Sequence, residues 1–400
     1  MLAELEERLA EIEARGLRRQ TRVVDGPQGP HVLVDGRPAL LLCSNNYLGL
    51  ADHPRVRQAA ADAALRWGVG AGASRLVSGT MTIHQELEHR LAEFKGTPSA
   101  LLFGSGYLAN TGVVAALAGS GEVVFSDELN HASIIDGCRL SRAEVFVYRH
   151  RDVEHLRWGL ERAGRRASLI VTDSVFSMDG DIAPLPELVE LAQRNRIRLV
   201  VDEAHATGAL GPGGRGAVAA AGLTENVDVI VGTLGKALGS YGAFVACDEP
   251  TAQYLTNTAR TFIFSTAPPV PAIAGALAAL ALLRERPALV DTLQARGRQL
   301  RRALTLEGFG ADTGITQIVP LIVGDPSLAM RVCERALGLG VFAQAIRPPT
   351  VPAGTARLRL AVMATHSEQE LRQAAGVLGA AARECGIDLP PPTEQLRVTA

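Results

Sequence analysis

The feature that most constrains the fold is an alternation of short apolar runs with helix-like segments between about residues 100 and 246. Apolar runs occur at 100–103, 122–125, 144–148, 168–171, 198–201, 227–231 and 243–246. Helical patterns lie between most of them, beginning near residues 107, 131, 153 and 185. Strands that are apolar on both faces are typical of a parallel sheet covered by helices on each side. The pattern therefore predicts an α/β fold with a large, mostly parallel sheet.

The alternation ends near residue 264, and the rest of the chain has mixed elements. Expected helices cover 272–286, 288–306, 328–337 and 368–382, and expected strands cover 318–323 and 357–361. A chain of 400 residues is also longer than a single hydrophobic core usually supports. We therefore expect a smaller α+β C-terminal domain. The predicted boundaries are an N-terminal helix and arm at 1–50, a large domain at 51–286, a small domain at 287–388 and a mobile tail at 389–400.

Composition and charge argue against several classes of function. The formal net charge of −2 gives no basic excess of the kind that nucleic-acid or membrane binding requires. The five cysteines are scattered without a CxxC pair, so they predict reduced thiols and neither a disulfide framework nor a zinc site. The N-terminal segment has leucines at helical spacing but lacks the apolar core of a signal peptide. We expect a cytoplasmic protein that binds no metal, nucleic acid or membrane.

The loops that follow the apolar runs are where chemistry is expected, because open α/β sheets bind ligands beyond the carboxyl ends of their strands. One such loop, FGSGYLAN at 103–110, opens a helix. Gly104 and Gly106 permit a sharp turn there, and the helix N-terminus offers amide groups to an anion. The loop is compatible with a phosphate site and equally with a plain strand–helix turn.

Three further loops place polar side chains at the ends of apolar runs. Asp202 and His205 follow one run, where they could hold a ligand or simply cap a helix. Ser177 is at the tip of another loop, and His131 is at the start of a helix. A single histidine is more often structural than catalytic. These residues gain a function only if the strand ends that carry them converge.

Lys236 stands among glycines and small residues in VGTLGKALGS, directly after an apolar run. A Walker A motif is excluded because the spacer is too short and Ala237 replaces the Ser/Thr that binds magnesium. Two interpretations remain. Lys236 could extend from a helix start into water, or it could be a desolvated amine suited to forming a Schiff base. Thr233, one helical turn earlier, could then bind a phosphate on the same ligand.

Taken together, the loops present a lysine, an acid at a neighbouring strand end, histidines and a phosphate cradle. Pyridoxal phosphate (PLP) needs this set of groups. A lysine holds its aldehyde, and an acid keeps its ring nitrogen protonated, so that the ring withdraws electrons. The residues therefore predict a PLP site at the carboxyl ends of the strands.

The motifs and their order resemble the α-oxoamine synthases, a family of fold-type-I PLP-dependent transferases. The matching motifs are SNNYLGL (44–50), SRLVSGT (74–80), HQELE (84–88), SGYLAN (105–110), HAS (131–133), SVFSMDGDIAPL (174–185), DEAH (202–205), TLGKALG (233–239), FST (264–266) and PPTVPAGTARLRL (348–360). They cover about residues 40 to 370. The resemblance implies an aspartate aminotransferase-like fold and a homodimer with shared active sites.

The resemblance also assigns cofactor contacts. Lys236 matches the lysine that holds PLP, Asp202 the acid that faces the ring nitrogen, and His131 the imidazole that stacks on the ring. These three are the expected catalytic residues. The other expected cofactor contacts are the amides of Gly106 and Tyr107, the side chains of Ser177, His205 and Thr233, and Ser265 and Thr266 from a second subunit.

Substrate contacts are implied nearer the two ends of the chain. Arg359 matches the arginine that binds the amino-acid carboxylate. Arg347 stands where the chain most resembles the family members that condense L-alanine with a pimeloyl thioester in biotin biosynthesis. The resemblance implies that its positive charge receives the distal carboxylate of the pimeloyl chain. The thioester is pimeloyl-CoA or pimeloyl-ACP, where ACP is acyl carrier protein. Arg18, Asn45 and Thr350 are further expected contacts. The expected activity is thus that of an acyltransferase, with glycine and acetyl-CoA as the alternative substrates.

Two positions depart from the family pattern. Ala206 stands where glycine is usual, and Asn46 stands where aspartate is commoner in the pimeloyl-using members. Both departures concern the acyl substrate and leave the expected cofactor contacts intact. A protein that binds PLP without catalysis is disfavoured because the lysine, acid, histidine and arginine are all present.

Overall fold

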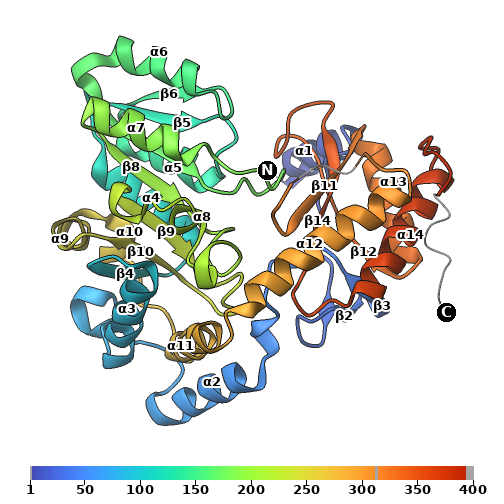
Figure 1. Ribbon diagram of the computed structural model, residues 1–400, viewed down its shortest axis with the longest axis horizontal. Helices are drawn as coiled ribbons and strands as arrows, with labels where there is room; N and C mark the ends of the chain where they lie inside the picture. The colour runs from blue at the N-terminus through green and yellow to red at the C-terminus, as the bar shows by residue number, and fades with distance from the viewer. Residues whose placement is uncertain (1, 311–313, 393–400) are drawn as a thin grey trace. The chain divides into compact units, whose positions relative to one another are not determined.

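The computed structural model describes residues 2–310 and 314–392 (Figure 1). The chain divides into two compact units. The large unit comprises Asn46–Ser177 and Asp181–Asp291, and the small unit comprises Met1–Asn45, Met178–Gly180 and Thr292–Ala400. The tail expected at 389–400 lies outside the described residues from residue 393 onward. Each unit is built on its own sheet or sheets.

The large unit contains a seven-stranded sheet with the order β4-β10-β9-β8-β7-β5-β6 (Figure 1). Its strands are β4 (Ser99–Phe103), β5 (Val123–Asp127), β6 (Glu144–Tyr148), β7 (Ala167–Asp173), β8 (Arg198–Asp202), β9 (Val229–Thr233) and β10 (Ala243–Cys247). Neighbouring strands from β6 to β9 are parallel, whereas β10 is antiparallel to both β4 and β9. Every predicted apolar run overlaps one strand, so the mostly parallel sheet is confirmed.

Helices of the large unit pack on this sheet through apolar residues. They are α2 (Pro54–Trp67), α3 (Thr82–Lys95), α4 (Gly106–Leu117), α5 (Ala132–Ser141), α6 (Val153–Ala163), α7 (Leu185–Asn195), α8 (Ala217–Ala220), α9 (Glu249–Thr258), α10 (Arg260–Ile263) and α11 (Val270–Glu285). Val113 of α4 and Ile134 of α5 are fully buried in one cluster with Val171, Val200 and Val231 of the central strands. Because alternate strand residues face one side of a sheet, this cluster fixes α4 and α5 on a single face.

The small unit combines two short sheets with helices. The first sheet has the order β1-β2-β3-β12 and the second β11-β14-β13. The strands are β1 (Val24–Asp25), β2 (His31–Val34), β3 (Arg37–Leu41), β11 (Ile318–Gly324), β12 (Val341–Phe342), β13 (Gln344–Ile346) and β14 (Ala356–Ala361). The helices are α1 (Leu2–Ala14), α13 (Pro326–Gly338) and α14 (Glu368–Glu384), while α12 (Ala288–Leu306) begins in the large unit. The expected smaller α+β part is confirmed.

The β2–β3 hairpin was not among the sequence expectations. Its two turn residues, Asp35 and Gly36, have φ values of 50° and 76°. An Asp-Gly pair between alternating apolar residues is a strong hairpin signal, because both residues tolerate positive φ. The hairpin was therefore accessible from the sequence. Among the described residues, no helix is both long and apolar enough to cross a membrane.

Candidate active site

Three neighbouring strands of the large unit end in polar residues at one edge of the sheet. β7 ends at Asp173 and β8 at Asp202, and these two residues are paired in register. The next strand, β9, ends at Thr233. Since carboxyl ends of parallel strands meet at the same edge, the loops beyond them converge, as a ligand site in an open α/β sheet requires.

Lys236 follows β9 and is one of only two lysines in the chain. Its Nζ lies 2.9 Å from Nε2 of His205, whose Nδ1 lies 2.6 Å from the hydroxyl oxygen of Tyr47. The other lysine, Lys95, is 1 % exposed and forms an ion pair with the buried Glu203. Lys95 is thus committed to an internal ion pair, and Lys236 is the candidate for covalent chemistry.

The turn that carries Lys236 is not helical. The amide of Gly239 donates to the carbonyl of Lys236, and Gly239 has a φ of 60°. A Cβ at Gly239 would lie 2.3 Å from the amide nitrogen of Ala51, so the position requires glycine. The expectation that Thr233 precedes Lys236 by one helical turn is therefore wrong. Thr233 instead ends a strand, and a tight turn brings the chain back from it.

Asp202 is buried, and both of its carboxylate oxygens accept hydrogen bonds. Oδ2 accepts from Nδ2 of Asn110 at 2.6 Å, and Oδ1 accepts from the amide of Ala204 at 2.7 Å. The same Nδ2 of Asn110 donates to Oγ of Ser133 at 2.9 Å. The acid is therefore held in a defined orientation by one side chain and one backbone group.

His131 is the N-cap of α5. Its Nδ1 lies 2.8 Å from Oγ of Ser133, and its backbone amide donates to Oδ2 of Asp173 at 2.7 Å. The surrounding atoms desolvate the ring and lower the pKa of His131; Asp202 opposes this effect and Lys236 adds to it. Burial, assisted by the charge of Asp202, raises the pKa of Asp173 well above its usual range. The expected His131 thus lies within the same group of residues as Asp202 and Lys236.

An anion site is available at the start of α4. Ser105 caps this helix by accepting from the amide of Leu108 at 3.2 Å, and Gly106 and Tyr107 are its first residues. The first amides of a helix have no partner within the helix, and they favour negative charge. A Cβ at Gly106 would meet no atom within 4 Å. Oγ1 of Thr233 accepts from the amide of Gly235 at 3.1 Å and donates to the carbonyl of Gly242 at 3.0 Å.

The remaining expected cofactor contacts lie in two loops of the large unit. Ser177 is in the loop after β7, which an isolated bridge between Val175 and Ile182 closes. Thr266 follows α10 and forms an isolated bridge with Ser74. An amine, a fixed carboxylate, ring nitrogens and an open helix N-terminus are the groups that PLP requires, so the residues of the large unit fit this cofactor.

Arg359 of the small unit lies on β14 and is only 6 % exposed. Its Nη2 is 3.2 Å from Oδ1 of Asn45, so two of the expected substrate contacts touch each other. A buried guanidinium beside a neutral amide is suited to binding a carboxylate, because it presents two parallel donors.

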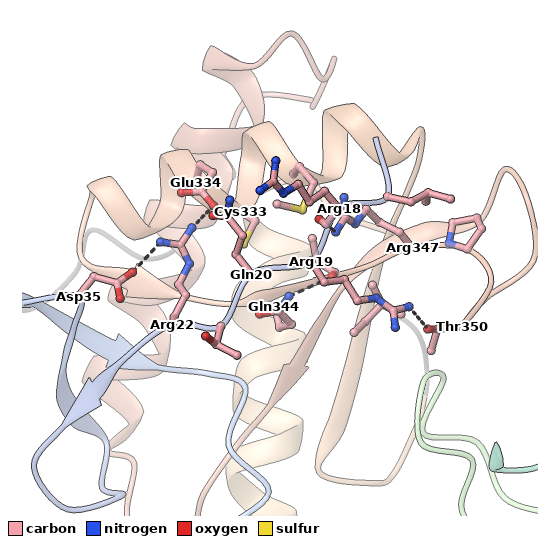
Figure 2. Close-up of a pocket in the computed structure, with 16 residues that line it drawn as sticks. Arg18, Arg19, Gln20, Arg22, Asp35, Cys333, Glu334, Gln344, Arg347 and Thr350 are labelled. Carbon is pink, nitrogen blue, oxygen red and sulfur yellow. Dashed lines mark hydrogen bonds and ion pairs between the residues drawn. The ribbon is translucent and has the colours of Figure 1, made fainter. Parts of the chain in front are cut away.

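The other three expected substrate contacts line one pocket of the small unit, of about 380 Å³ (Figure 2). Arg347 donates to the backbone carbonyls of Gly16 and Arg18, at 3.2 Å in the second case. The guanidinium of Arg18 pairs with Glu13 at 2.5 Å. Figure 2 shows that Arg19, which sequence reasoning missed, points instead toward Thr350, and its Nη2 lies 3.4 Å from Oγ1 of that residue.

Several residues of the site were not singled out from the sequence. In the large unit they are Tyr47, Asn110, Ser133 and Asp173. The first three lie inside quoted motifs, so a closer reading of polar residues within those motifs could have found them. Asp173 could have been found as the last residue of its strand.

Known proteins share this architecture. The model of the aminotransferase class I and II family matches residues 37–378. An 8-amino-7-oxononanoate synthase of Geobacter metallireducens is 52% identical over 386 residues, which cover 95% of this chain and 98% of that protein. A solved structure of SPT (serine palmitoyltransferase) with PLP has a TM-score of 0.91 and 34% identity, over 96% of this chain and 98% of that one. A crystal structure of 8-amino-7-oxononanoate synthase from Francisella tularensis has a TM-score of 0.75 and 28% identity, over 86% and 98%.

These similarities extend over nearly the whole chain and include both units. They agree with the mostly parallel sheet of the large unit. The chain belongs to the aminotransferase class I and II family and, within it, to the α-oxoamine synthases.

Proposed function

We propose that the chain joins L-alanine to the acyl group of a pimeloyl thioester, releasing carbon dioxide and the free thiol, to form 8-amino-7-oxononanoate in biotin biosynthesis. One observation carries this proposal. Arg347 and Arg19, both without an acidic side-chain partner among the described residues, line the same pocket of about 380 Å³. Such a pocket suits the carboxylate at the far end of a pimeloyl chain. The name of the 52% identical relative supports the same product.

The large unit supplies the cofactor contacts. PLP provides an electron-withdrawing ring that stabilises negative charge on the α-carbon of a bound amino acid. Lys236 would hold PLP covalently, and Asp202 would pair with its ring nitrogen. The other contacts are assigned to the amides of Gly106 and Tyr107, to His131, Ser177, His205 and Thr233, and to Ser265 and Thr266 of a second copy.

Lys236 is the proposed carrier of the reacting proton. Its Nζ would take the proton from the α-carbon of alanine and return it after carbon dioxide has left. Nε2 of His205, 2.9 Å away, orients this amine. His131, whose pKa is lowered chiefly by desolvation, would offer a ring N–H to the carbonyl oxygen that develops in the acyl group. General acid–base steps of this kind contribute roughly 10²–10⁴-fold each.

Two arginines would distinguish the two carboxylates of the reaction. Arg359 would bind the carboxylate of alanine, with Asn45 beside it. Arg347 would bind the distal acyl carboxylate, together with Arg18 and Thr350. An acetyl thioester has no such carboxylate, and its condensation with glycine would leave Arg347 without a substrate group to bind.

A second copy of the chain is the proposed partner, with active sites shared between the copies. Leu65, Val77 and Phe264 are large apolar side chains that are 89 %, 79 % and 70 % exposed. Phe264 directly precedes the residues assigned to the neighbouring copy's cofactor. A symmetric homodimer would cover these side chains. The acyl carrier in the proposal is coenzyme A or ACP.

A product assay tests the proposal. The protein, loaded with PLP, is given L-alanine with pimeloyl-CoA, and separately glycine with acetyl-CoA, and products are identified by mass spectrometry. We expect kcat/KM to be at least about tenfold higher for the first pair, because the second loses a charged contact. Equal or higher activity with glycine and acetyl-CoA would reject the pimeloyl assignment. Light scattering on the same sample measures whether the chain is dimeric.

A further inference from the structure

Asn110, which the proposed mechanism does not use, lies at the centre of a buried hydrogen-bond network. Its Nδ2 donates to Oδ2 of Asp202 at 2.6 Å and to Oγ of Ser133 at 2.9 Å. Oγ of Ser133 is in turn 2.8 Å from Nδ1 of His131. Asn110, Ser133 and Asp202 are 1 %, 0 % and 4 % exposed. One amide therefore connects the acid with the histidine of the candidate site.

The amide of Asn110 has one orientation that suits these neighbours. Nδ2 carries two hydrogens, and each of them has an acceptor. The reverse orientation would bring Oδ1 against the carboxylate of Asp202, where two acceptors repel each other. In the observed orientation, Oδ1 is buried without a hydrogen-bond partner among the described residues. Burying an unpaired oxygen costs free energy, and an apolar residue at this position would avoid that cost. The two hydrogen bonds that Nδ2 donates are therefore the reason for an asparagine here.

Ser133 extends the same constraint to His131. Because Oγ of Ser133 accepts from Asn110, its own hydrogen is available to Nδ1 of His131. The backbone amide of Ser133 also donates to this Nδ1, at 3.3 Å. With both donors directed at Nδ1, that nitrogen is an acceptor, and the proton of the neutral ring lies on Nε2.

We propose that Asn110 is a positioning residue that sets both the orientation of the Asp202 carboxylate and, through Ser133, the Nε2–H tautomer of His131. The inference rests on the proposed function in one respect: it takes Asp202 as the partner of the PLP ring nitrogen. The amide of Ala204 holds the other oxygen of Asp202. Without Asn110, the carboxylate keeps one fixed contact and can rotate about it, and Ser133 loses the hydrogen bond that orients its hydroxyl toward His131.

The test compares Asn110→Ala with Ser133→Ala and with a control, Thr111→Val. Thr111 is also buried on α4, but its hydroxyl donates to the carbonyl of Tyr107 and contacts neither Asp202 nor His131. For each variant, thermal unfolding of the PLP-free protein reports folding, and equilibrium dialysis measures PLP affinity. The nitrogen NMR signal of PLP labelled with ¹⁵N in its ring reports whether the ring nitrogen is protonated.

Asn110→Ala should weaken PLP binding roughly tenfold or more, the effect of losing a hydrogen bond to a charged group, and should move the ring-nitrogen signal toward the unprotonated form. Ser133→Ala should leave that signal unchanged but shift the pH dependence of kcat, because only the His131 branch is cut. Thr111→Val should match the wild type in both readouts. A wild-type affinity and ring-nitrogen signal in folded Asn110→Ala would overturn the inference.

Two further results keep the test decisive. If Asn110→Ala does not fold, Asn110→Leu fills the space without donors and is measured in the same way. The PLP readouts need no acyl substrate, so a wild-type chain that binds PLP but makes no 8-amino-7-oxononanoate would refute the proposed function and leave the Asn110 comparison intact. A wild-type complex with an unprotonated ring nitrogen would overturn the inference about Asn110 directly.

Discussion

Lys236 of the large unit and Arg347 of the small unit are held by different means. In the large unit, side chains hold one another, as Lys236 and His205 do. In the small unit, Arg347 is held by the backbone carbonyls of Gly16 and Arg18. Members of a buried side-chain network depend on each other, so removing one disturbs the rest. Removing a side chain that contacts only backbone leaves its neighbours in place. We therefore expect the loss of Lys236 to affect its neighbours in the large unit and the loss of Arg347 to stay local in the small one.

The largest expected effect is that of Lys236→Ala. The variant loses the amine that would hold PLP and carry the proton, and its neighbour His205 loses a contact at 2.9 Å. Product formation should fall by at least about 10⁴-fold, since a covalent and a proton-transfer role are removed together. The yellow absorbance that borohydride fixes to the wild-type protein should disappear.

The scarcity of lysine makes this assignment easy to check. After borohydride treatment of the wild-type protein with PLP, mass spectrometry of peptides should find the added mass on Lys236 and none on Lys95, the only other lysine. Label on Lys95, or full activity of Lys236→Ala, would contradict the role assigned to Lys236. Lys236 could then no longer represent the large unit in the comparison with Arg347.

The next largest effect concerns stability and the second lysine. Lys95 donates to Oε2 of Glu203, to Oγ1 of Thr207 and to the carbonyl of Arg215, all inside the protein. Lys95→Met leaves the charge of Glu203 buried and unpaired, which costs about 3–5 kcal/mol. The free energy of unfolding, measured by urea titration, should fall by this amount.

A matched surface pair provides the control for Lys95→Met. Arg157 forms an ion pair with Glu154 on the exposed side of α6. Arg157→Ala should change the free energy of unfolding by about 0.5 kcal/mol or less, because exposed ion pairs contribute little. If both variants lowered the free energy of unfolding by the same amount, the buried ion pair would not stabilise the large unit more than an exposed pair does.

A feature of this structure could be predicted from the sequence where a pattern of neighbouring residues indicates it. The apolar runs located all seven strands of the large sheet. Six of these strands are buried along most of their length, whereas β6 is apolar in sequence although most of its residues are exposed. Motif matching located Lys236, Asp202 and His131. The contact between Lys236 and His205 has no local signal, since 31 residues separate them and only the order of β8 and β9 brings them together.

The small unit was less accessible to sequence reasoning for the same physical reason. β3 pairs with β12 across some 300 residues, and a two-residue strand carries almost no periodicity. The direction of an exposed arginine is likewise set by its partners. Motif matching selected Arg18, but this residue turns to Glu13, whereas its neighbour Arg19 reaches Thr350. Neighbouring arginines look alike in a sequence, and only their partners separate them.

The two units also differ in the pKa of a buried or half-buried histidine, and this difference predicts how stability depends on pH. In the large unit, burial alone would lower the pKa of His150, but hydrogen bonds to Asp127 and Asp181 raise it to about 9. In the small unit, burial lowers the pKa of His366 to about 4. Nδ1 of His366 accepts from the amide of Met363, which fits a neutral ring. One unit thus contains a charged histidine and the other a neutral one.

The two shifts destabilise the protein at opposite ends of the pH range. The contribution of His150 is complete below its ordinary pKa of 6.5 and is lost as pH rises toward 9. The contribution of His366 is complete above 6.5 and is lost as pH falls toward 4. Each is worth at most about 3.4 kcal/mol. Unfolding free energies measured from pH 4 to 9.5 should therefore show a flatter alkaline side in His150→Gln and a flatter acid side in His366→Gln. Parallel curves in wild type and variants would contradict both assignments.

The smallest expected effect, Arg347→Ala, tests the local character of the small unit most directly. Because this guanidinium contacts backbone carbonyls, its loss should leave the fold and the large unit's chemistry in place. The KM for pimeloyl-CoA should rise by about 10–100-fold, the range for one charged hydrogen bond to a carboxylate, while PLP binding and the affinity for alanine stay at wild-type values. Arg331→Ala, an exposed arginine of α13 outside the pocket, removes the same charge and should change none of these quantities. A fall in kcat or in PLP affinity in Arg347→Ala would mean that the loss reaches beyond the pocket, and the contrast between the two units would then fail.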